Sequence, residues 1–174
     1  MLLKNTRVLT REGYCPVEQL KAGDQVCSAF GKTKSLTILA VMSRGVPIFS
    51  GAGRDRLPAT DLTPVMIPAG AFGRDEPHRD VFLSSQQRIL APSKQRPQGP
   101  YGIRCVADCE YLSDKRPGKN EFHWADYFAL FFEYESLFIA DGVAVVGYSR
   151  EVLTSTPSVS KNNQLIRKAL LNDE

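Results

Sequence analysis

Long hydrophobic segments are missing from this sequence. No apolar run approaches the roughly 18 residues that a membrane-spanning helix requires. The first residues, Met1 to Asn5, contain only two leucines before the chain turns polar, which is too short for a signal peptide. We therefore expect no membrane partner and, by default, a cytoplasmic location.

An excess of charge of one sign is missing as well. The 22 basic and 19 acidic residues leave a formal net charge of +3, and no basic cluster exceeds Lys32-Thr33-Lys34 or Lys115-Arg116. This balance does not indicate a nucleic-acid partner. Glycine (13) and proline (11) are near average usage, which argues against disordered and collagen-like classes. A chain of 174 residues is long enough for one domain with its own core.

The sequence is also poor in metal-binding patterns. Its four cysteines are Cys15, Cys27, Cys105 and Cys109. Their even number permits two disulfides, but a domain of this size does not need them. The Cys105-x-x-x-Cys109 spacing is loose for zinc, and Cys15 and Cys27 lie twelve residues apart. We expect free thiols, no metal and no cofactor.

Short strands separated by frequent turns dominate the pattern. Apolar and β-branched residues predict strands at 7–10, 14–17, 25–30, 35–42, 65–67, 80–83, 88–91 and 124–134. Residues 137–140 and 143–146, joined by Asp141-Gly142, predict a hairpin. Apolar spacing in 163–171 predicts a short amphipathic helix. The sequence thus predicts a mainly β domain over 1–156 and a helical tail over 157–174.

One motif is distinctive: Thr6-Arg7-Val8-x-Thr10-x-x-Gly13-x-x-Pro16-Val17-Glu18-x-Leu20-x-x-Gly23-Asp24-x-Val26. It resembles the opening of Hint domains, the self-processing module shared by hedgehog proteins and inteins, and particularly the bacterial hedgehog/intein-like group. Three further segments resemble that group in the expected order, namely 64–73, 83–90 and 132–142. The resemblance implies a horseshoe-type all-β fold, and by family analogy it also leaves non-classical export open.

The chemistry implied by this resemblance points to four positions. In the family, a Cys or Ser at the first position attacks the preceding carbonyl, and a histidine of a Ser/Thr-x-x-His block protonates the leaving nitrogen. The corresponding residues here are Met1 and Gln87, and neither a thioether nor a carboxamide can do that work near neutral pH. Ser84 keeps the orienting position, and Glu135 takes the place of a later histidine. If the polypeptide starts at Met1, we expect that no preceding bond exists to be cleaved.

Other candidates have simpler structural explanations. Cys15 and Cys27 are substitute nucleophiles in principle, but buried thiols are commonly inert. His78 lies in a polar loop, and His123 precedes a predicted buried strand. We therefore predict a Hint-type domain that has lost self-cleavage and acts as a binding or structural module for an unknown protein or peptide. The alternatives are an autoprocessing domain of a longer precursor and a small-molecule or peptide binder that uses the old cleft.

Overall fold

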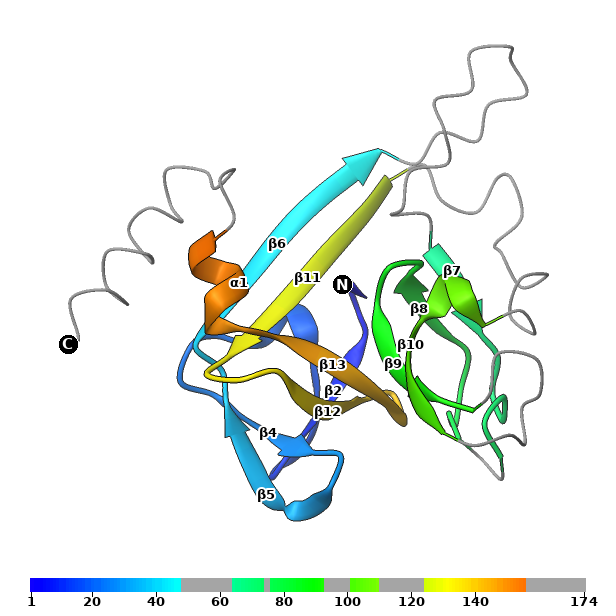
Figure 1. Cartoon of the computed structure of the whole chain (residues 1–174), viewed down its shortest axis with the longest axis horizontal. Helices are drawn as coiled ribbons and strands as arrows, with labels where there is room; N and C mark the ends of the chain where they lie inside the picture. Colours follow the sequence, from blue (N-terminus) through cyan, green and yellow to red (C-terminus); the bar gives the residue numbers. More distant parts are fainter. Residues whose placement is uncertain (48–63, 74–75, 93–100, 110–123, 156–174) are drawn as a thin grey trace.

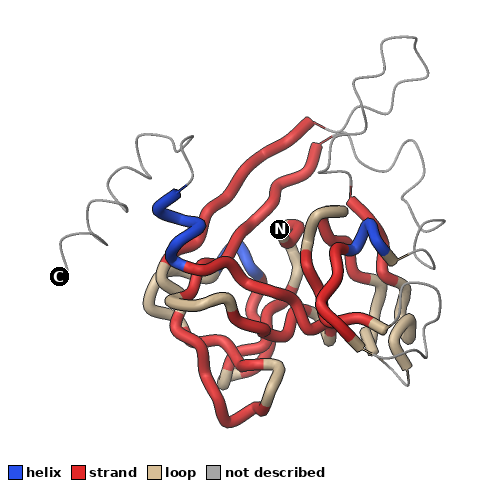
Figure 2. Tube along the Cα trace, in the orientation of Figure 1, coloured by secondary structure: helices blue, strands red, loops and turns tan. Residues whose placement is uncertain are grey.

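The strands of this protein form one continuous open sheet. The computed structural model describes residues 1–47, 64–73, 76–92, 101–109 and 124–155. Within them, a 13-stranded sheet follows a path in the order β3-β2-β4-β12-β13-β11-β1-β8-β7, with β5, β6, β9 and β10 paired to its members (Figures 1 and 2). The strands are β1 (Leu2–Leu3), β2 (Arg7–Thr10), β3 (Gly13–Pro16), β4 (Gln25–Ser28), β5 (Gly31–Thr37), β6 (Ala40–Pro47), β7 (Pro64–Ile67), β8 (Val81–Ser84), β9 (Arg88–Ala91), β10 (Gly102–Cys105), β11 (Trp124–Phe132), β12 (Ser136–Ala140) and β13 (Val143–Ser149).

Helical structure in the described residues is short. Two single-turn 3-10 helices occur, η1 (Val17–Gln19) and η2 (Val106–Asp108), and one α-helix, α1 (Arg150–Ser155), follows β13. No helix in these parts of the chain is long and apolar enough to cross a membrane. The mainly β fold expected from the sequence is therefore confirmed.

The turn signals predicted several elements correctly. β2 and β3 form the first hairpin, with Arg7 opposite Pro16 and Thr10 opposite Gly13. β12 and β13 form the late hairpin, in which Ala140 pairs with Val143. Its two connecting residues, Asp141 and Gly142, have φ values of 46° and 82°. A tight turn with two positive φ angles matches the twist of the flanking strands, which explains the Asp-Gly sequence.

Two predicted strands differ from the structure. The strand expected over 35–42 is divided, because β5 pairs with β4 whereas β6 pairs with β11, and Ile38 and Leu39 lie at the change of partner. The strand at 124–134 was expected to be covered on both sides. Its first half instead alternates between buried and more exposed residues, and only Ala129 to Phe132 are buried throughout. α1 was not predicted, and the helix predicted at 163–171 lies outside the described residues.

The first strand lies in the middle of the sheet. β1 pairs with β11 on one side, with Leu2 opposite Phe128, and with β8 on the other, with Leu2 opposite Leu83. Leu2 is 2% exposed and belongs to the main hydrophobic cluster. Figure 1 shows the N-terminus between β11 and the β8–β9 region. Burial of a leucine on a central strand is worth roughly 1.5–3 kcal/mol, so packing fixes where residue 1 must lie.

Candidate functional site

Met1 lies against the turn that joins β8 to β9. Its carbonyl oxygen accepts a hydrogen bond from the Ser84 backbone N–H at 3.1 Å. Its amine donates to Ser84 Oγ at 3.0 Å and to Gln87 Oε1 at 2.6 Å. Three of the four positions singled out in the sequence, Met1, Ser84 and Gln87, are thus brought into direct contact although more than 80 residues separate the first from the others.

The turn that carries Ser84 and Gln87 is held by a hydrogen bond within the turn and by hydrogen bonds from a neighbouring segment. The Gln87 N–H donates to the Ser84 carbonyl at 2.9 Å and closes the turn. From the neighbouring β10–η2 segment, Val106 N–H donates to the Gln87 carbonyl at 2.9 Å, and Ala107 N–H donates to the Ser85 carbonyl at 2.8 Å. Ser84 is fully buried and Gln87 is 3% exposed. These contacts hold both side chains in place.

The carboxamide of Gln87 has a defined orientation. Its Nε2 donates to the Val146 carbonyl at 2.9 Å and to the Arg88 carbonyl at 2.8 Å. Both N–H bonds of the amide are therefore used, and the oxygen Oε1 must face the nitrogen of Met1. Toward residue 1, Gln87 acts as a hydrogen-bond acceptor.

Burial changes the chemistry of the Met1 amine. It lowers the pKa of this amine from 8.0 to about 5, and the nearby Cys105 opposes the shift only in part. Desolvation disfavours a cation, so the amine is neutral at pH 7. The neutral amine still has two N–H bonds, which it can donate to Ser84 Oγ and Gln87 Oε1, the two nearest acceptors.

Two residues of this site were missed by sequence reasoning. The hydroxyl of Tyr148 lies 3.5 Å from the Met1 nitrogen. Burial raises the pKa of Tyr148, with a further contribution from Cys105, so the phenol keeps its proton. Cys105 at the end of β10 influences both Tyr148 and the Met1 amine. The alternation of residues along a strand does not indicate that Tyr148 lies near residue 1. The Cys105-x-x-x-Cys109 spacing was considered only as a possible zinc-binding pattern.

Glu135 does not join the contacts around Met1. It forms an ion pair with Arg88, in which Arg88 Nη2 donates to Glu135 Oε1 at 3.1 Å, and both side chains are about half exposed. Glu135 does line a cavity of about 200 Å³ together with Gln87, Gly147 and Tyr148. Glu135 therefore lines the same cavity as Gln87 without contacting Met1, and its carboxylate is paired with the guanidinium of Arg88.

The remaining sequence candidates lie elsewhere. Cys15 lines a separate cavity of about 310 Å³ next to Asp24. Burial, followed by the charges of Asp24 and Glu18, raises the pKa of the Cys15 thiol, which disfavours a nucleophilic thiolate. Cys27 is buried.

His78 does not belong to the site. His78 is exposed in the loop before β8, and His123 lies outside the described residues. In the described ranges no group of three or more His, Cys, Asp or Glu residues is placed to hold a metal ion.

Comparisons with known proteins agree with this architecture. The sequence matches the family described as "Hint domain" over residues 1–150. Among solved structures, the MchDnaB-1 intein is similar with 13% identity and a TM-score of 0.50, covering 84% of this chain and 99% of that one. The Msm DnaB1 intein splicing domain bound with zinc is similar with 13% identity and a TM-score of 0.51, covering 86% of this chain and 100% of that one.

At this identity the likeness shows the shared fold alone. None of the curated proteins matches this sequence. The family match covers most of the 174 residues, from before β1 to the first residue of α1. This chain belongs to the Hint domain family.

Proposed function

We propose that this Hint domain does not cleave or splice itself and serves as a binding or structural module. The observation that carries the proposal is the orientation of Gln87. In peptide-bond cleavage before residue 1, the nitrogen of residue 1 is the leaving group and must receive a proton. Gln87 presents an oxygen to that nitrogen, and both of its N–H bonds are engaged by backbone carbonyls.

The side chain of residue 1 supports the same conclusion. A thioether has no proton to lose and cannot become the thiolate that an acyl shift requires. Met1 contributes apolar surface instead, because its side chain packs against the two smaller hydrophobic clusters beside β11. The position therefore performs a packing role where the family has a nucleophile.

One observation favours the alternative, an autoprocessing domain within a longer precursor. Ser84 Oγ still contacts the nitrogen of residue 1 at 3.0 Å, and the Tyr148 hydroxyl lies near the same atom. An upstream segment that supplied its own nucleophile would find these two groups in place. Glu135 adds little to this alternative because Arg88 engages its carboxylate.

A reporter fusion separates the two functions. We would place a reporter protein before Met1 and measure release of the reporter with and without a small thiol. The natural sequence should remain intact, and so should Met1→Cys alone. The double variant Met1→Cys with Gln87→His should gain thiol-dependent cleavage, because it restores both an attacking sulfur and a proton donor. Cleavage of the unmodified fusion at the junction would refute the proposal.

A further inference from the structure

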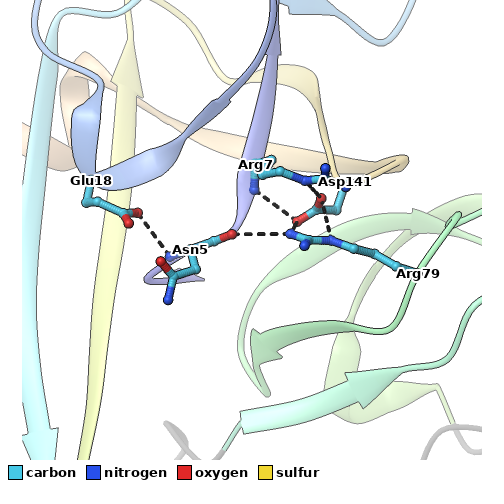
Figure 3. A network of polar contacts seen from close by, with 5 residues as sticks. All are labelled: Asn5, Arg7, Glu18, Arg79 and Asp141. Carbon is cyan, nitrogen blue, oxygen red and sulfur yellow. Dashed lines mark hydrogen bonds and ion pairs between the residues drawn. The ribbon is translucent and has the colours of Figure 1, made fainter.

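Asp141 in the late hairpin is a buried carboxylate that binds two arginines at once. Its side chain is 2% exposed. Oδ1 accepts from Arg7 Nε at 2.8 Å and from Arg79 Nε at 2.9 Å. Oδ2 accepts from Arg79 Nη2 at 2.7 Å and from the Arg7 backbone N–H at 2.9 Å. Figure 3 shows both guanidinium groups converging on this one carboxylate.

The backbone around Asp141 makes this arrangement rigid. Asp141 N–H donates to the Arg7 carbonyl at 2.8 Å, and the Arg7 N–H donates back to the Asp141 carboxylate. These two hydrogen bonds join β2 to the hairpin turn. Gly142 follows with φ +82°, and a Cβ there would lie 3.3 Å from Pro77 Cα, in the loop that carries Arg79. The carboxylate therefore sets the position of both arginines relative to each other.

The cluster keeps one positive charge and several donors to spare. Two guanidinium groups share a single carboxylate, and their side chains are 42% and 44% exposed. The Arg7 guanidinium donates through Nε to Asp141. Within the described residues, its two terminal nitrogens donate to no protein acceptor. Arg79 donates through Nε and Nη2, the latter also to the Asn5 carbonyl at 3.2 Å. Among the described residues, its Nη1 has no acceptor, and it can donate to an outside group.

The other carboxylate drawn in Figure 3, that of Glu18, is not paired with either arginine. Glu18 accepts the Asn5 backbone N–H at 3.0 Å and forms no ion pair with Arg7 or Arg79. On the other side, the Arg7 guanidinium carbon lies 5.3 Å from the ring centre of Tyr14. Tyr14 is 39% exposed, so an aromatic surface lies beside the donors.

We propose that Arg7 and Arg79, positioned by Asp141 and flanked by Tyr14, bind an acidic side chain of a partner polypeptide. The planar guanidinium presents parallel N–H bonds that match a carboxylate. One surplus positive charge balances one carboxylate better than it balances a phosphate dianion. Arginine and tyrosine are also enriched among the residues that contribute most to binding energy at protein interfaces. This inference rests on the proposed function as a binding module, for which it names the class of partner.

The test is an NMR titration of the full chain with a capped hexaglutamate peptide. The Nε–Hε signals of Arg7 and Arg79 should shift, and capped hexaglutamine should leave them unchanged. Arg79→Gln should weaken hexaglutamate binding at least tenfold. Arg79→Lys should recover only part of the loss, because it keeps the charge without the planar donor pair.

Arg44→Gln is the matched control, since Arg44 is an exposed arginine on β6, and its affinity should stay within twofold of the natural chain. The proposal is overturned if hexaglutamate does not shift the Arg7 and Arg79 signals at millimolar peptide. It is also overturned if Arg44→Gln weakens binding as much as Arg79→Gln, or if only inorganic phosphate binds.

The wild-type signals locate the site even if a variant folds poorly. Failure here is separate from failure of the proposed function, because self-cleavage of the reporter fusion would not alter this titration.

Discussion

Replacing Gln87 with alanine should reveal how much the β8–β9 turn depends on one carboxamide. The substitution removes the donors to the Val146 and Arg88 carbonyls and the acceptor at the Met1 nitrogen. Val146 is 5% exposed, so its carbonyl would be left in a dry environment. A buried polar group without a partner costs about 1–3 kcal/mol. Because Arg88 is exposed, water can replace part of the second bond, and we expect a total loss of about 2–4 kcal/mol.

The assay for this prediction is urea unfolding followed by circular dichroism. The midpoint should fall while the slope m stays constant, since the folded surface is nearly unchanged. Gln86→Ala is the matched control: Gln86 is the exposed neighbour in the same turn, so its replacement should change stability by less than about 0.5 kcal/mol. If Gln87→Ala costs no more than Gln86→Ala, the carboxamide is not a structural anchor and the orientation argued above is wrong.

Three further predictions follow from the buried amine, the close-packed strand β13 and the arginine pair. The Met1 amine has a pKa of about 5 in the folded chain and 8.0 when exposed, so the unfolded chain binds more protons between these two pH values. The free energy of unfolding should therefore rise from pH 5 to pH 8 by up to roughly 4 kcal/mol. Urea unfolding at a series of pH values measures this rise. Gly147→Ala would place a Cβ 2.2 Å from Phe132 Cε2, and this overpacking should cost about 1–3 kcal/mol in thermal or urea unfolding. Asp141→Asn should cost about 1–3 kcal/mol in urea unfolding, because the amide cannot accept four hydrogen bonds from two guanidinium groups and a backbone N–H.

Each of these predictions has a control on the same chain. Acetylation of the Met1 amine should remove the dependence on pH between 5 and 8, and an unchanged slope would contradict the assignment. Gly102→Ala meets nothing nearer than 3.4 Å, at the flexible end of Arg104, and should be close to neutral. Asp108→Asn changes an exposed carboxylate and should cost less than about 0.5 kcal/mol. Equal losses for Asp108→Asn and Asp141→Asn would contradict the structural role of the buried carboxylate.

Residue 1 is held in place by the strands beside it and by the β8–β9 turn. β1 is held by β11 and β8 through Leu2 and Leu3, and these bonds do not depend on the side chain at position 1. The β8–β9 turn is held by backbone contacts from η2 and by the side chain of Gln87. Glutamine can fill this structural place without acting as an acid. The position of residue 1 is therefore set by strand pairing and by the β8–β9 turn, and the thioether of Met1 is not needed for it.

Local sequence determined the turns and most of the strands. The hairpins at 7–16 and 136–149 follow from Gly13 and from the Asp141-Gly142 pair, because their backbone angles restrict which residues fit. The division between β5 and β6 could not be predicted, since residues 35–42 are uniformly suited to a strand. Only the change of partner from β4 to β11 divides them.

The tertiary structure alone decided which side chains meet. The sequence aligned Met1, Ser84, Gln87 and Glu135 with functional positions, but contact depends on β1 lying between β8 and β11. That placement brings the first three together and leaves Glu135 with Arg88. Tyr148 joins through the long-range pairing of β13, for which local periodicity gives no signal. Local backbone conformation depends on neighbouring residues, whereas contacts across the sheet depend on the packing of the whole chain.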